Sequence, residues 1–207
     1  MNLVGPTVHI VDDDQSFRTA VGRLLEASGY RVAAYESGEE LLARLPSGHG
    51  CILLDLQMPG LSGLELQARL ADMAPFLPIV FLTGRGNISI TVQAMKAGAY
   101  DFLEKPASST AVLEAVKRAL QLCETRRLEQ DRVQALHTLV ARLTPRESQV
   151  FRLIVRGKRN KQIAYELSTS ERTVKAHRHN VMEKLGARSL AEAVSMAERL
   201  GLLEKTA

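Results

Sequence analysis

Two hydrophobic periods alternate along the first part of the chain. Short apolar runs of strand length occur at Val8–Val11, Val32–Tyr35, Cys51–Leu54, Ile79–Leu82 and Tyr100–Leu103. Between and after these runs, apolar residues recur at helical spacing, as at Phe17, Val21, Leu24 and Leu25. Strands that alternate with helices predict right-handed βαβ units. We therefore expect an α/β domain over residues 1–122, with a doubly wound sheet of five parallel strands.

The remaining chain has only the helical period. Residues 123–142 contain neither Gly nor Pro and predict a helical linker, which either continues the last helix of the first domain or forms a second one; a solvated charged connector is the alternative. Thr144, Pro145 and Glu147 then form a capping box that begins a helix. The pattern predicts an all-α domain over residues 143–207 with four helices, at Pro145–Val155, Lys161–Leu167, Glu171–Leu185 and Leu190–Arg199.

Composition agrees with two small domains in 207 residues. No apolar run reaches the roughly 20 residues of a membrane helix, and Met1–Pro6 lacks an export signal, so we expect a cytoplasmic protein with no membrane partner. Charge is uneven. Up to Glu124 there are 10 Lys and Arg against 14 Asp and Glu, net −4; from Thr125 onward there are 17 against 9, net +8. The basic part predicts an anionic partner.

Acidic residues follow two of the predicted strands. Asp12 and Asp13 come directly after the first strand, and Asp55 follows the third. The carboxyl ends of parallel strands gather at one edge, so these carboxylates should converge if strands one and three are neighbours. Clustered carboxylates need protons or a hard dication, and Mg²⁺ suits oxygen ligands. A solvated acidic loop is the alternative.

The fourth and fifth strands end in two further polar residues. Thr83 supplies a hydroxyl and Lys105 an ammonium group. Around an aspartate and a dication, these groups would neutralise a phosphoryl group carried on Asp55, which would be the nucleophile. Taken singly, a threonine here is usually a cap and a Lys-Pro pair a strand stop. Their occurrence at the ends of separate strands, in order, favours a phosphoryl site.

The strings VDDDQSFR, LLDLQMPGLSGLEL, FLTGRGN and AMKAGAYDFLEKP closely resemble the receiver domain of two-component response regulators, which has a flavodoxin-like fold. The resemblance implies that Asp55 takes a phosphoryl group from a sensor histidine kinase and that Phe102 is a switch aromatic. It implies that phosphoryl oxygens bind Thr83 and Lys105. The implied Mg²⁺ site uses the side chains of Asp13 and Asp55, the backbone carbonyl of Gln57 and a metal-bound water on Asp12. Receivers usually have Phe after Lys-Pro, whereas this chain has Ala107, and Lys105–Pro106 is a candidate cis bond.

The basic part contains a helix-turn-helix pattern. Positions that would face inward are Ile163, Ala164, Leu167, Val174, His177, Val181 and Leu185. Arg172, Lys175, Ala176 and His179 fall on an outward face of the second helix, which suits insertion into the major groove. Phosphate charge would be neutralised by Lys158, Arg159, Lys161 and Arg178. A protein-interaction module with a solvated basic face is the alternative.

The string LTPRESQV…GKRNKQIAYELSTSERTVKAHRHNVMEKLGARS resembles the LuxR-type helix-turn-helix of NarL/FixJ response regulators. By this resemblance Lys175, Ala176 and His179 are base-facing, and Thr173 and Asn180 contact the DNA backbone. Thr169 departs from the family, which prefers an aliphatic residue in the turn. The GRGN and AMKAGAYDFLEKP stretches are most similar to the FixJ branch.

Together the two halves predict a phosphorylation-activated transcriptional regulator rather than an enzyme. Phosphorylation would either pair two receivers in a homodimer or release the basic domain from its own receiver. Either event would present two recognition helices to double-stranded DNA at a two-fold symmetric promoter site, with RNA polymerase as a further partner. Three alternatives remain: a phosphorylation-independent dimeric DNA-binding regulator, a small-molecule-sensing LuxR-type regulator and a haloacid-type phosphatase. The phosphatase requires a DxD motif, whereas Gln57 occupies its second acidic position. The front half has no apolar ligand-pocket pattern.

Overall fold

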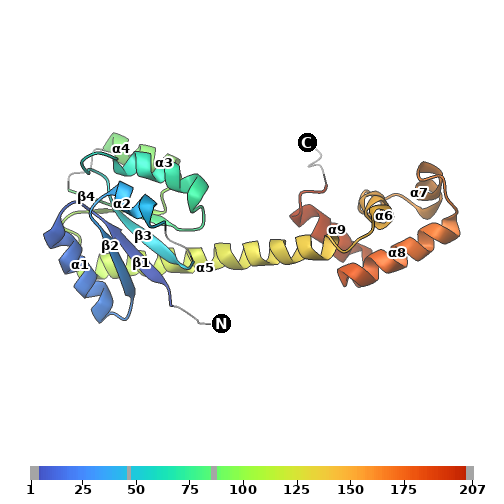
Figure 1. Ribbon diagram of the computed structural model, residues 1–207, viewed down its shortest axis with the longest axis horizontal. Helices are drawn as coiled ribbons and strands as arrows, with labels where there is room; N and C mark the ends of the chain where they lie inside the picture. The colour runs from blue at the N-terminus through green and yellow to red at the C-terminus, as the bar shows by residue number, and fades with distance from the viewer. Residues whose placement is uncertain (1–4, 46–47, 85–87, 204–207) are drawn as a thin grey trace. The chain divides into compact units, whose positions relative to one another are not determined.

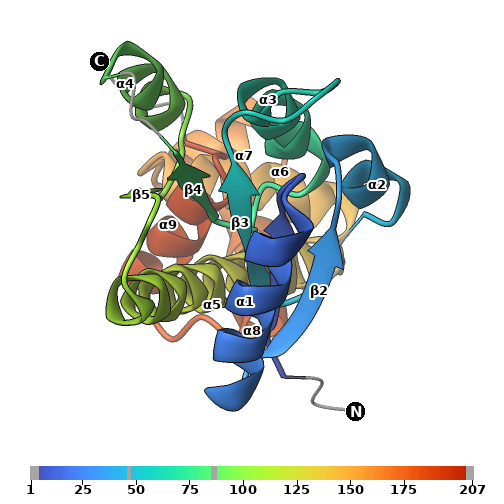
Figure 2. The same ribbon diagram turned by 90° about the vertical axis from the view of Figure 1, so that its left-hand side faces the viewer.

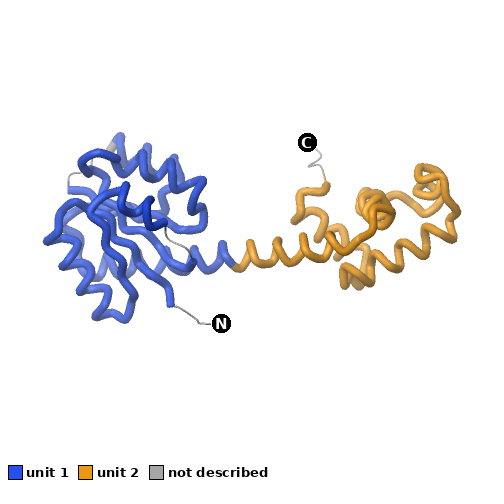
Figure 3. The backbone as a smooth tube through the Cα atoms, viewed as in Figure 1, with its two compact units in different colours: residues 1–127 blue, residues 128–207 orange. Residues whose placement is uncertain are grey.

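The structure is a computed structural model that describes residues 5–45, 48–84 and 88–203. It divides into two compact units, residues 1–127 and residues 128–207 (Figure 3). The division falls inside the segment 123–142 that the sequence predicts as a linker. Of the GRGN stretch used in the sequence comparison, residues 85–87 lie outside the described residues.

The first unit contains a five-stranded parallel sheet in the order β2-β1-β3-β4-β5 (Figure 1). The strands are β1 Thr7–Val11, β2 Arg31–Tyr35, β3 Gly50–Asp55, β4 Ile79–Thr83 and β5 Asp101–Glu104. All five strands expected from the sequence are confirmed, with ends that differ by no more than one residue. The order makes β1 and β3 neighbours, as the predicted convergence of carboxylates requires.

Helices cover both faces of this sheet (Figure 2). They are α1 Gln15–Ala27, α2 Gly38–Ala43, α3 Gly63–Met73, α4 Ile88–Lys96 and α5 Ser109–Val140. Helices α1 and α5 pack on one face, where Cys51 and Leu53 of β3 point. Helices α2, α3 and α4 pack on the other face, against Ile52 and Leu54. All of β3 is buried, which explains its continuous apolar sequence.

Helix α5 continues without a break across the boundary between the two units. Of the two arrangements that the sequence left open, a single continued helix is therefore the one present. Its first part is buried in the first unit through Val112, Val116 and Ala119. Its last turn, at Leu139 and Val140, packs against the core of the second unit.

The second unit is helical, with α6 Pro145–Val155, α7 Asn160–Glu166, α8 Glu171–Leu185 and α9 Leu190–Arg199. Thr144 and Glu147 form the predicted capping box at the start of α6. Glu147 also accepts a 2.6 Å hydrogen bond from Lys184 Nζ, which ties α8 to this cap. The hydrogen bond from Lys184, together with those from Thr144, lowers the pKa of the buried Glu147 to about 2. Among the described residues, no helix is long and apolar enough to cross a membrane.

Candidate functional site

Three carboxylates meet at the carboxyl edge of the sheet. Asp12 and Asp13 follow β1, and Asp55 is the last residue of β3. The pairing of Val11 with Leu54 brings the next residues of the two strands together. Carboxylate oxygens from the three aspartates lie within 4.8 Å of one another. Asp12 and Asp55 are buried whereas Asp13 is exposed, so the cluster opens to solvent on one side.

Lys105 lies against this cluster from the end of β5. Its Nζ atom is 2.5 Å from Asp12 Oδ2 and 3.2 Å from Asp55 Oδ1. Its backbone amide donates to the Thr83 carbonyl over 2.6 Å, which joins the ends of β4 and β5. The bond between Lys105 and Pro106 is cis. One ammonium group therefore contacts two of the three carboxylates.

The electrostatics of the cluster favour a cation. Burial raises the pKa of Asp55 above its ordinary value, the Lys105 ammonium lowers it, and the Asp12 carboxylate raises it again. A net raised pKa means that the single lysine does not fully compensate the buried negative charge. Three carboxylates that present oxygens within 4.8 Å of one another are a donor set that fits a hard dication such as Mg²⁺.

Three other predicted site residues lie at the end of β4, in β5 and just after β3. Thr83 is almost fully buried, and within the described part of the chain its hydroxyl has no hydrogen-bond partner. A buried polar group without a hydrogen-bond partner is rare in native proteins and calls for an explanation. Phe102 is partly buried and packs against the core beneath α4. Gln57 is exposed two residues beyond the end of β3.

Asp14 directly follows Asp12 and Asp13 and has a different role. Asp14 accepts hydrogen bonds from the backbone amides of Ser16, at 2.8 Å, and Phe17, at 3.2 Å, and so caps α1. Arg18 donates to the Asp12 carbonyl over 2.6 Å. The ring of Phe17 lies beside Lys105, with the ring centroid 4.2 Å from Nζ. Sequence reasoning missed this contact because Phe17 fits the apolar period of α1.

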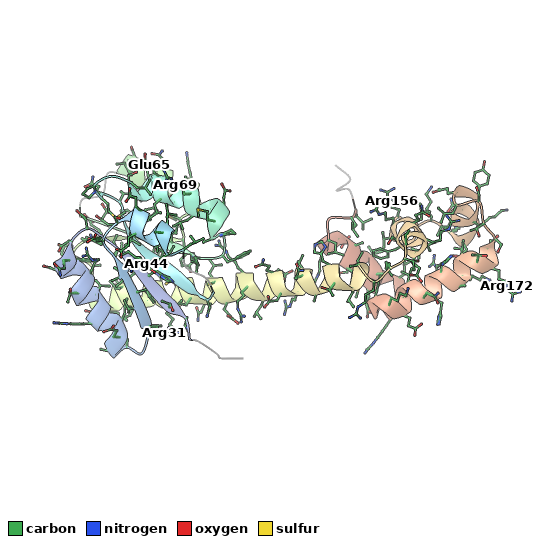
Figure 4. All side chains as sticks on the ribbon, viewed as in Figure 1. Arg31, Arg44, Glu65, Arg69, Arg156 and Arg172 are labelled. Atoms are coloured by element: carbon green, nitrogen blue, oxygen red, sulfur yellow. The ribbon has the colours of Figure 1, made fainter. Side chains whose placement is uncertain are left out.

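The outer face of α8 carries the residues predicted to contact nucleic acid. Val174, Val181 and Leu185 are buried, as expected, and His177 is half-buried. Arg172 projects from the first turn of α8, away from the helices behind it (Figure 4). The other predicted contact residues are exposed, apart from the half-buried Arg178: Lys161, Thr173, Lys175, Ala176, His179 and Asn180.

Two of the basic residues named for phosphate charge lie near the start of α7. Lys158 pairs with Glu166 over 2.7 Å, so part of its charge is neutralised within the unit. Arg159 precedes α7 and is exposed. Gly157, Lys161 and Arg178 line the same surface hollow as these two residues. The basic residues thus gather around one depression next to α8.

Two family models match the chain. Residues 8–117 match the response regulator receiver domain, and residues 141–197 match the bacterial regulatory proteins of the luxR family. Each match covers most of one compact unit.

Curated proteins and solved structures match over nearly the whole length. Nodulation protein W of Bradyrhizobium diazoefficiens is 43% identical over 196 residues, which cover 94% of this chain and 86% of that protein. The transcriptional regulatory protein FixJ of Rhizobium meliloti is 41% identical over 92% of this chain and 94% of that protein. A structure of the response regulator StyR is 46% identical with a TM-score of 0.80, covering 94% of this chain and 98% of that one. Full-length FixJ from B. japonicum is 36% identical with a TM-score of 0.58, covering 96% and 98%.

Proposed function

Since the chain belongs to the NarL/FixJ family of two-component response regulators, and is thus a transcriptional regulator with a receiver domain and a LuxR-type DNA-binding domain, we propose that phosphorylation of Asp55 controls its binding to DNA. The observation that carries this proposal is the juxtaposition of Asp55, two further carboxylates and Lys105 at one sheet edge. We assign residues 1–122 to the receiver, 123–142 to a helical linker and 143–207 to the DNA-binding domain.

The phosphoryl donor is a phosphohistidine of a sensor histidine kinase. A carboxylate oxygen of Asp55 attacks the phosphorus, the phosphorus–nitrogen bond breaks, and the departing nitrogen takes up a proton from solvent, so that the histidine leaves as neutral imidazole. Asp13 and Asp55, with the Gln57 carbonyl, would hold Mg²⁺, and Asp12 would hold it through a metal-bound water; the three clustered carboxylates support this assignment. When bound, the dication neutralises charge on the transferred phosphoryl group.

Lys105 and Thr83 serve the phosphorylated state. Lys105 Nζ lies 3.2 Å from Asp55, within reach of a phosphoryl oxygen on that residue. The Thr83 hydroxyl, which has no hydrogen-bond partner among the described residues, gains an acceptor when the phosphoryl group is present. Movement of Thr83 leaves space that Phe102 fills, and this changes the face formed by α4 and β5. The receiver thereby assists its own phosphorylation without acting on a separate substrate.

DNA is bound by the second domain in the major groove. The exposed face of α8 supports base contacts by Lys175, Ala176 and His179, with Arg172 beside them. Backbone contacts come from Lys161, Thr173, Arg178 and Asn180. Phosphorylation pairs two receivers, so that two α8 helices meet a two-fold symmetric promoter site in the cytoplasm, where RNA polymerase is a further partner.

Intact mass after incubation with acetyl phosphate and Mg²⁺ tests the first step. We expect one phosphoryl group on the wild type and on the control Asp72→Asn, whose aspartate is exposed on α3 and outside the cluster. Asp55→Asn should remain unmodified. Modification of Asp55→Asn to the wild-type level would overturn the assignment of the acceptor.

Light scattering with Mg²⁺ and beryllofluoride, a phosphoryl mimic, tests the second step. A shift from monomer to dimer in the wild type but not in Asp55→Asn supports phosphate-gated pairing. Equal dimerisation and DNA binding by both proteins, with or without the mimic, would instead establish the phosphorylation-independent regulator.

A further inference from the structure

Two carboxylates and one aromatic ring lie close to the ammonium group of Lys105. Asp12 Oδ2 accepts a hydrogen bond from it at 2.5 Å, and Asp55 Oδ1 forms an ion pair with it at 3.2 Å. The ring is that of Phe17, with its centroid 4.2 Å from Nζ. This distance is well within the range of a cation–π interaction, in which a cation is attracted to the face of an aromatic ring.

Phe17 is held firmly in place relative to the carboxylate cluster. It is the third residue of α1, and its backbone amide donates to the capping side chain of Asp14. The ring packs against the core between the sheet and α1. The next residue, Arg18, binds the carbonyl of Asp12. Helix α1 therefore carries the ring to a fixed position beside the end of β1.

From this geometry we propose that Phe17 is a positioning residue for Lys105, an inference that rests on the proposed acceptor role of Asp55. The lysine side chain is flexible, so two carboxylates alone would allow its ammonium group to turn towards either one. The ring contacts the ammonium group beside the carboxylates. The ring therefore restricts the ammonium group of Lys105 to orientations that face Asp55.

The expected consequence concerns the rate of phosphorylation. A phosphoryl group on Asp55 needs the ammonium group at a defined place, because alignment and charge neutralisation supply most of the catalysis. Loss of the ring face should slow phosphorylation by acetyl phosphate about three- to tenfold, the range that a partly desolvated cation–π contact implies. Phe17→Leu removes the ring and keeps apolar bulk, whereas Phe17→Tyr keeps the ring face.

Nuclear magnetic resonance of the unphosphorylated protein tests the contact directly. The aromatic ring current should change the chemical shifts of the Lys105 side chain in the wild type and in Phe17→Tyr. In Phe17→Leu, which lacks the ring, these chemical shifts should take the ordinary values of a lysine. Lys105→Met, which lacks the Lys105 resonances, provides the assignment. Because this measurement needs no phosphorylation, it separates failure of the contact from failure of the proposed acceptor.

Phosphorylation kinetics test the consequence. Val21→Ala is the matched control, since Val21 is buried in the same helix and core as Phe17. We expect slow phosphorylation in Phe17→Leu, near-wild-type rates in Phe17→Tyr, and near-wild-type rates in Val21→Ala despite its lower stability. Unchanged Lys105 resonances in Phe17→Leu, a wild-type rate in that variant, or an equal loss in Val21→Ala would each overturn the proposal.

Discussion

We expect that replacement of Gly63 with alanine displaces the backbone of Asp55. Gly63 is the first residue of α3, and a methyl group built there would lie 2.5 Å from the Asp55 carbonyl oxygen. It would also lie 2.9 Å from Leu56 Cα and 3.0 Å from Phe81 Cε1. All three distances are shorter than ordinary van der Waals contacts of a methyl carbon.

The surroundings of Gly63 offer little relief. Its amide donates to the Leu56 carbonyl over 3.1 Å, so α3 cannot withdraw without losing this hydrogen bond. The Phe81 ring is fully buried. The end of β3 must therefore move, and Asp55 moves with it. Overpacking of this kind costs about 1–3 kcal/mol. We expect the receiver to lose that much stability and Gly63→Ala to accept phosphate more slowly than the wild type.

Urea unfolding and acetyl phosphate kinetics measure both effects. Gly22→Ala provides the control, because Gly22 is also a buried helical glycine and its added methyl group would lie 3.9 Å from Val32 Cγ1, an ordinary van der Waals distance. Alanine inside a helix is favoured over glycine by about 1 kcal/mol, so this variant should be more stable than the wild type and equally active. A Gly63→Ala protein with wild-type stability and phosphorylation rate would refute the reasoning.

Three further predictions concern pH and DNA. Burial lowers the pKa of His9 to about 4, so wild-type stability should fall as the pH drops from 6.5 towards 4, and urea unfolding of His9→Phe should show a weaker fall. The pKa of Glu147 is lowered from its ordinary 4.5 to about 2, chiefly by the hydrogen bond from Lys184. The ionised Glu147 therefore stabilises the second unit above pH 4.5, and this stabilisation is lost as the pH falls towards 2. Calorimetry of Lys184→Met should show a loss of stability at neutral pH that disappears towards pH 2. In anisotropy titrations, Lys161→Ala should weaken binding to all DNA sequences and reduce the salt slope by about 1, whereas Lys175→Ala should cost about 1–3 kcal/mol and relax base preference.

The position of the acidic site could be predicted from the sequence, because the hydrophobic pattern predicts the strands and their topology. Once apolar runs predict parallel strands, the residue after each run must lie at one edge, and this brings Asp12, Asp55 and Lys105 together. Contacts within that edge depend on side-chain direction and helix phase. For this reason the cap formed by Asp14 and the ring of Phe17 beside Lys105 were not predictable from hydrophobic spacing.

The linker shows a second limit of sequence reasoning. Residues 123–142 contain only helix-compatible residues, and a continued helix and a separate helix have the same local pattern. The choice depends on whether a break near Cys123 would expose buried surface. Cys123 is buried in the first unit, so the chain is already helical and packed where a second helix would have to begin.

The burial pattern of α8 has a consequence for changes in promoter preference. The residues that anchor this helix are Val174, Val181 and Leu185, together with Lys184 in its ion pair. The residues proposed to face the DNA bases are different ones, and they are exposed: Arg172, Lys175, Ala176 and His179. Substitutions at exposed positions typically change stability by no more than about 0.5 kcal/mol. Under the proposed DNA contacts, changes on this face alone would therefore alter promoter preference, while the packing that holds the helix stays the same.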